Sequence, residues 1–206
     1  MIRVRSHRRS LVRNERGAVL TEFGLLIVPM CILLLGLLDL GYLMYLRSTF
    51  QGAINDVARL ATVQNPTISG TGTVEQRMDA AIRERMRGLA INATYDVREQ
   101  SVEDFTQIGK PEKLISDVNR NGRHDPGDCW IDLQQNGTFD TAPVRSGLGG
   151  ADDVVLYTAN LTMPRMFPMA KLLGASPNYE ILVKATVRNQ PYANQASSPT
   201  VCSAAS

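Results

Sequence analysis

The sequence predicts an α+β fold, in which one long N-terminal helix crosses a membrane and extends into a small periplasmic head built on an antiparallel sheet. Three observations support this prediction. An apolar run of 28 residues occupies positions 18–45, and helical spacing of apolar residues continues beyond it as far as residue 62. Two late segments then alternate apolar and polar residues, as half-buried strands do.

Residues 18–46 form the predicted transmembrane helix. This 28-residue run would extend roughly 42 Å as a helix, which exceeds a hydrocarbon core of ~30 Å. Six arginines and one acidic residue precede the run, within residues 1–17. This basic flank predicts that the N-terminus lies in the cytoplasm and that everything after Leu46 lies outside. Pro29 should bend the helix, and Asp39 is expected near the outer interface.

Glu22 is a lone carboxylate near the inner end of this run. A charge at that depth costs about 2.5–3.5 kcal/mol on insertion scales, so it needs a partner. Cleavage between Gly17 and Ala18 would create an α-amino group about one helical turn away, on this chain or on a neighbour. The alternative is an uncut signal anchor. An ordinary secretory signal peptide is disfavoured, because its apolar core would be shorter and the cut would follow it.

Residues 47–188 form the predicted head. The first helix continues into it and ends at Asn65-Pro66, because the residue before a proline avoids helical geometry. A second helix should begin near Thr73, which forms a candidate capping box with Gln76. Strands are expected over 91–98, 153–163 and 179–188, with a short turn of helix over 164–173.

The formal charge of +2 comes from the leader, since residues 1–17 carry a net +5 and the remainder carries −3. This basicity is a topology signal, so nucleic acid is not an expected partner. Cys31 lies within the membrane run, where a buried apolar thiol is expected. Cys129 and Cys202 lie on the outer side and can pair if that side is oxidising. The polar tail 189–206 is expected to be loose except where Cys202 ties it down.

The segment 117–128 has the spacing of an EF-hand-like calcium loop, in which glycine at position 6 lets oxygen ligands wrap around a hard cation. The expected ligands are Asp117, Asn119, Asn121, Arg123 (through its carbonyl), Asp125 and Asp128. Pro126-Gly127 argues against a helix leaving the loop. We therefore expect an isolated calcium loop rather than an EF-hand pair, with His124 at the surface. The alternative is a surface turn without metal.

A weaker second copy follows, so that calcium loops would occupy 117–140. Its expected ligands are Asp132, Gln134, Asn136, Thr138 and Asp140. Position 12 of this copy is Pro143, whose side chain cannot bind a metal. A distant acid such as Asp152 or Asp153 would have to complete it.

The segment from Arg16 to Phe23, together with residues 37–42, resembles the TadE-like minor pilins of the Tad (Flp) pilus. The resemblance is most specific over residues 13–62. A late segment, 185–192, is close to that family's Arg-Asn-Glu-Pro-aromatic ending, with Gln190 in place of the glutamate.

This resemblance implies a pilin-like fold and a pseudopilin of the type IV pilus class. An aspartyl prepilin peptidase would cut it between Gly17 and Ala18, with Glu22 and Phe23 serving assembly. The implied partners are other pilins and pseudopilins, the peptidase and the inner-membrane assembly platform. The implied place is the inner membrane, as a single-pass protein, and then a secretion-type pilus used in cell adhesion.

No catalytic constellation is visible. The histidines are His7 and His124, and the sequence has no nucleophile elbow, phosphate loop or Cys/His zinc spacing. We therefore expect a non-enzymatic minor pseudopilin with a calcium-stabilised head, and we disfavour a tethered hydrolase. The open alternative is a membrane-anchored periplasmic calcium-dependent binding module.

Overall fold

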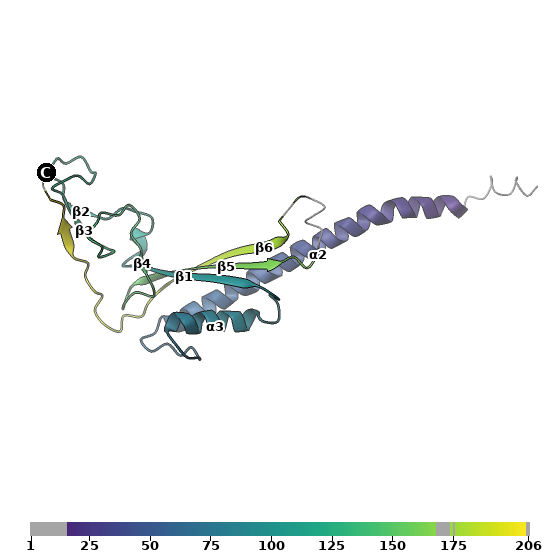
Figure 1. Ribbon diagram of the computed structural model, residues 1–206, viewed down its shortest axis with the longest axis horizontal. Coiled ribbons are helices and arrows are strands. Elements are labelled where there is room, and N and C mark those ends of the chain that lie inside the picture. Colours follow the sequence, from purple (N-terminus) through teal and green to yellow (C-terminus); the bar gives the residue numbers. More distant parts are fainter. Residues whose placement is uncertain (1–15, 168–173, 175, 205–206) are drawn as a thin grey trace, which may run out of the picture. The chain divides into compact units, whose positions relative to one another are not determined.

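The computed structural model describes residues 16–167, 174 and 176–204, and Figure 1 shows the order of its elements. The chain divides into two compact units. The first unit comprises Met1–Met44 and Arg165–Pro177, and the second comprises Tyr45–Pro164 and Asn178–Ser206. Residues 1–15 of the predicted leader and 168–173 of the predicted helical turn lie outside the described residues.

Helix α2, Arg16–Ala61, continues through Pro29. In the first unit its large apolar side chains are exposed on all sides, from Val19 to Met44. The helix is long and apolar enough to cross a membrane. Because such a surface is unfavourable in water, this part of α2 is consistent with a single-pass membrane anchor.

Asp39 has a partner that the sequence did not reveal. The carboxylate is buried, and Arg165 Nη1 donates to Asp39 Oδ2 at 2.6 Å, within the first unit. Arg165 also donates from Nε to Ser176 O at 2.9 Å. The ion pair neutralises an acid on an otherwise apolar stretch, where an isolated charge would be costly.

The second unit builds its core on the last turns of α2. The buried residues recur at helical spacing and are Leu46, Phe50, Ala53, Ile54, Val57, Ala58 and Ala61. Helix α3, Val74–Met86, buries Met78, Ile82 and Met86. Its predicted capping box is confirmed, since Thr73 accepts from Gln76 N while Gln76 accepts from Thr73 N.

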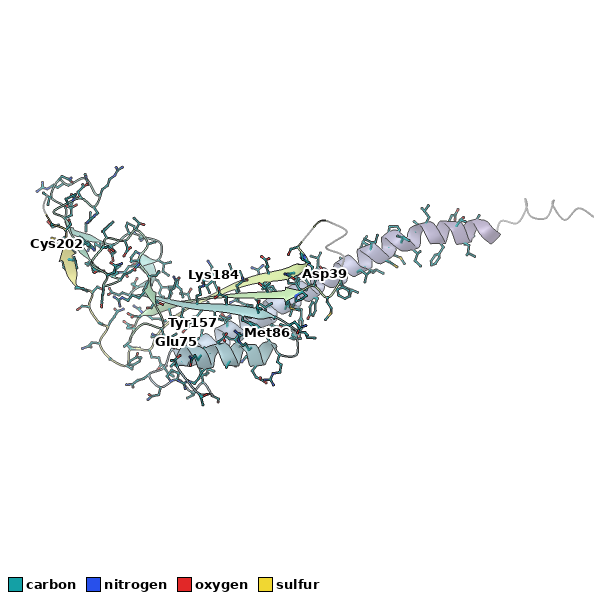
Figure 2. The ribbon with its side chains drawn as sticks, viewed as in Figure 1. Asp39, Glu75, Met86, Tyr157, Lys184 and Cys202 are labelled. Atoms are coloured by element: carbon teal, nitrogen blue, oxygen red, sulfur yellow. A yellow bond between two sulfur atoms is a disulfide. The ribbon has the colours of Figure 1, made fainter. Side chains whose placement is uncertain are left out.

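The main sheet is antiparallel, as predicted, with strand order β4-β1-β5-β6. Its strands are β1 (Thr94–Val102), β4 (Arg145–Ser146), β5 (Val154–Pro164) and β6 (Asn178–Arg188). β5 pairs with β6 over its whole length, from Val154 opposite Arg188 to Pro164 opposite Asn178. Alternate residues of both strands are buried, including Tyr157, which Figure 2 labels. The apolar residues of the predicted alternation therefore face the core.

A second sheet was not predicted. It has the order β2-β3-β7, with β2 at Leu114–Ser116, β3 at Cys129–Ile131 and β7 at Thr200–Cys202. A 3-10 turn, η1 (Phe105–Gln107), follows β1. β7 is part of the tail and contains Cys202, the residue at which the expectation of a loose tail made its exception.

Candidate functional site

The first calcium-loop segment, 117–128, connects β2 to β3. Positive φ angles at Arg120 (58°) and Gly122 (73°) turn the chain back on itself. The Asp117 carboxylate accepts N–H groups of Asn121 (3.3 Å) and Gly122 (2.7 Å). Glycine suits position 6, because a side chain there would be strained at this φ. The loop thus closes around its first residue.

The polar side chains of this loop meet at Asp125. The Asn119 and Asn121 amides both donate to Asp125 Oδ2, at 2.8 Å and 2.6 Å. These two donors hold the pKa of Asp125 below its usual value. Each of these amides carries an oxygen beside the donating nitrogen, so a side-chain rotation would present oxygens where N–H groups now lie.

Asp128 closes the first loop from position 12. Its Oδ1 accepts Val118 N and its Oδ2 accepts Asp125 N, both at 2.8 Å. These donors belong to positions 2 and 9 of the loop. Asp128 is fully buried, and no basic side chain in the described chain lies within ion-pair distance of it. Among the described residues, its charge is therefore offset by the backbone N–H groups of Val118 and Asp125.

The second segment, 132–140, repeats the first at positions 1, 4, 5, 6 and 9. Gln135 (φ 59°) and Gly137 (φ 75°) reverse the chain at positions 4 and 6. Asp132 accepts Asn136 N (3.2 Å) and Gly137 N (2.7 Å), and Asn136 donates to Asp140 Oδ2 at 2.8 Å. The sequence copy is thus also a structural copy.

Glu112 completes the second loop, and the sequence reasoning missed it. Its Oε1 accepts Leu133 N at 2.7 Å, and its Oε2 accepts Asp140 N at 2.9 Å. These are positions 2 and 9, the same two that Asp128 bridges in the first loop. Glu112 is 3% exposed. It therefore stands where residue 12 of the second loop would stand.

The acids expected to complete the second loop lie elsewhere. Asp152 pairs with Arg188 at 3.1 Å. Asp153 accepts Gly150 N at 2.7 Å and the Gln195 amide at 2.8 Å. That expectation was wrong because the calcium-loop pattern places its last ligand after the loop in the sequence. Glu112 precedes the loop, and the pairing of β2 with β3 brings it close. The only available signal was an isolated acid just before a short strand.

The two loops are also not isolated from each other. His124 and Phe139, at position 8 of each loop, stack with ring centroids 4.6 Å apart and planes 6° apart. The buried Trp130 of β3 meets the His124 ring edge-on at 4.7 Å. His124 is thus half-buried, not at the surface as expected, and the prediction of an isolated loop was wrong. No helix flanks either loop in the described chain.

The predicted disulfide is confirmed. Cys129 and Cys202 are joined, and they lie opposite each other on β3 and β7. Cys31, expected to be buried, is exposed on α2. An exposed thiol within an apolar helix fits a surface that meets lipid or other helices instead of the chain's own core.

The residues expected at the cleavage and assembly end lie on the first turns of α2. Gly17, Ala18, Glu22 and Phe23 are all exposed, and Thr21 Oγ1 donates to Ala18 O at 2.8 Å. Among the described side chains none forms an ion pair with Glu22. The carboxylate is therefore accessible to another group.

One comparison with known protein families gives a match, and this match lies on helix α2. No protein of curated function and no solved structure matches. Residues 17–59 match the family model described as TadE-like protein. The match covers most of α2 and stops before β1 and the paired loops. Over residues 17–59, this chain is therefore similar to the TadE-like proteins of Tad pilus systems.

Proposed function

We propose that this TadE-like chain is a non-enzymatic minor pseudopilin that assembles or initiates a Tad (Flp) pilus. The main support is the family match over residues 17–59, which coincides with the exposed apolar part of α2 and the start of the buried part. Exposed apolar residues of the first unit provide a surface for lipid before assembly and for other pilin helices after it. The head remains in the periplasm and meets other pilus components.

Processing is the first step of this proposal. Prepilin peptidase would cut between Gly17 and Ala18, because both are exposed at the start of α2. The new α-amino group would lie roughly 6 Å along the helix axis from Glu22. Glu22 would then pair with the amine of this chain or, after assembly, of a neighbour. The cost of a charge in the membrane favours such a pair.

The mass of the chain purified from membranes tests this step. In cells with an active prepilin peptidase we expect a chain that begins at Ala18, with a free or methylated amine. Glu22→Gln should leave the cut intact but reduce incorporation into pili, because the amide cannot form the ion pair. Glu22→Asp is the matched control, since it keeps the charge. A wild-type chain that keeps residues 1–17 would refute processing.

We also propose that the paired loops bind two calcium ions, which stabilise the head. Three acids at the ends of the loops are buried: Glu112 is 3% exposed, Asp128 0% and Asp132 2%. None has a basic partner in the described chain. Buried carboxylates without a cation are unfavourable, and calcium prefers oxygen ligands of this kind.

The donor set fits calcium in chemistry. Each loop offers carboxylate and amide oxygens at positions 1, 3, 5 and 9, a backbone carbonyl at position 7, and a buried carboxylate from Asp128 or Glu112. In the described chain no three acids, histidines or cysteines already converge as metal ligands. Side-chain amide N–H groups now lie against Asp125 and Asp140, and these amides would rotate on calcium binding so that their oxygens face the ion. Calorimetric titration of the calcium-stripped chain should count two ions.

A membrane-anchored calcium-dependent binding module is the second candidate. It is favoured by one observation, that the family match ends before the loops begin. An uncleaved chain that stays outside the pilus, but still takes up calcium, would support this candidate over the first.

A further inference from the structure

The C-terminal tail contacts both loops through a five-residue stretch, 199–203. At its centre, Val201 of β7 pairs with Trp130 of β3, the strand that leads from the first loop to the second. The disulfide joins β3 to β7 at Cys202, which is labelled in Figure 2. A segment far along the chain therefore lies directly against the link between the two loops.

On the first loop the contact is made by Ser203. Its Oγ accepts Gly127 N at 2.9 Å and donates to Asp125 O at 3.1 Å. Its backbone N donates to Asp128 O at 3.0 Å. Ser203 thus fixes the main chain at positions 9, 11 and 12, the part of the loop that carries two of its carboxylates.

On the second loop the contact is made by Pro199. Asp132 N donates to Pro199 O at 2.9 Å, so the tail also fixes position 1 of this loop. A three-residue strand holds weakly on its own. The Cys129–Cys202 bond, which joins residues 73 apart in the sequence, keeps the tail in place.

We propose that the disulfide sets the calcium affinity of both loops, so that the head binds calcium tightly only after this bond has formed. This inference rests on the proposed calcium binding. Backbone groups that orient metal ligands commonly account for a 10–100-fold change in affinity when they are lost. Freeing the tail removes such groups from Asp125, Asp128 and Asp132 at once.

The bond would form after the head leaves the cytoplasm. Two thiols become one disulfide, and their two protons and two electrons pass to a disulfide-bearing oxidant, whose own S–S bond breaks to give two thiols. Because such oxidants act outside the reducing cytoplasm, calcium loading would follow export. The order of events is export, oxidation and then calcium binding.

The test is a calcium titration of the full chain in detergent micelles, read by calorimetry and by the fluorescence of Trp130, the single tryptophan. The Cys129→Ser/Cys202→Ser chain should bind calcium about 10–100-fold more weakly than the oxidised wild type. Cys31→Ser is the matched control, because it removes a thiol without touching the disulfide, and its affinity should be unchanged. Circular dichroism checks the fold of each chain.

A second variant keeps the disulfide and removes the side-chain contact to one loop. Ser203→Ala should weaken the first site and leave the second unchanged, as measured in Asp132→Asn and Asp117→Asn backgrounds that isolate each site. This variant tests the contact between tail and loop if the Cys129→Ser/Cys202→Ser chain does not fold. Equal affinities for wild type and Ser203→Ala, or for the oxidised and the folded disulfide-free chain, overturn the inference while calcium binding stands. An oxidised wild type that takes up no calcium overturns the calcium proposal itself.

Discussion

Replacing Glu112 by glutamine tests whether this residue closes the second loop. The carboxylate oxygens accept Leu133 N at 2.7 Å and Asp140 N at 2.9 Å. Glutamine has nearly the same shape but offers one oxygen and one NH₂ group, so one of these donors loses its acceptor. A buried donor without an acceptor costs about 1–3 kcal/mol. A neutral amide is also a poorer calcium ligand than a carboxylate that can bind through both oxygens.

Two quantities should change in this variant. Without calcium, the free energy of unfolding should fall by up to about 1–3 kcal/mol, partly offset by removal of a buried charge. At a calcium concentration 100 times Kd, one site adds about 2.7 kcal/mol to stability. The calcium-dependent stabilisation should therefore fall by about that amount. Urea unfolding with and without calcium measures both effects, and calorimetry should count one ion instead of two.

Asp152→Asn is the matched control for Glu112→Gln. Asp152 is a half-exposed acid that pairs with Arg188 and lies outside both loops. It should still give a count of two ions and the full calcium-dependent stabilisation. If the Glu112→Gln chain keeps two ions of wild-type affinity, the assignment of Glu112 to position 12 is wrong.

Three further predictions concern the rest of the chain. Thr73→Ala removes the N-cap side chain of α3 and should lower the free energy of unfolding by about 1 kcal/mol, measured by urea unfolding. Thr73→Ser keeps the hydroxyl and is the conservative control. Burial, and then nearby carboxylates, raise the pKa of Glu99. Its ionisation thus favours the unfolded state, so Glu99→Gln should raise Tm at pH 7 and have no effect at pH 3, where both states are protonated. Arg165→Met leaves Asp39 without this partner and should speed proteolytic cleavage within residues 165–177, while exchanging the two residues should restore resistance.

The elements that the sequence predicted are those whose signal is local. Three signals each involve residues that are near one another in the sequence: the apolar run, the spacing of Phe50, Ile54 and Val57, and the Thr73–Gln76 pair. Strands β5 and β6 are long enough to show a clear alternation. Their ends fall within one residue of the predicted ranges. For these segments the helical or strand periodicity of apolar residues is sufficient to predict the element.

The features that the sequence did not reveal depend on contacts between distant residues. Strands β2, β3 and β7 have three residues each, which is too few for an alternation to be visible. Asp39 and Arg165 are 126 residues apart. Glu112 reaches the second loop only because β2 pairs with β3. The polar composition of the tail predicted a loose segment apart from Cys202, and it did not indicate that Pro199 and Ser203 would contact the two loops.

Because Glu112 precedes both loops in the sequence, the loops cannot be transferred to another protein as one short segment. Under the proposed calcium binding, a peptide cut at residues 117 and 140 would carry all the expected ligands of the first loop but would lack the final acid of the second. Extending the graft back to residue 112 would restore the second shell but not the lining supplied by residues 199–203. The smallest portable unit is therefore discontinuous, made of two separate stretches of chain joined by one sulfur–sulfur bond.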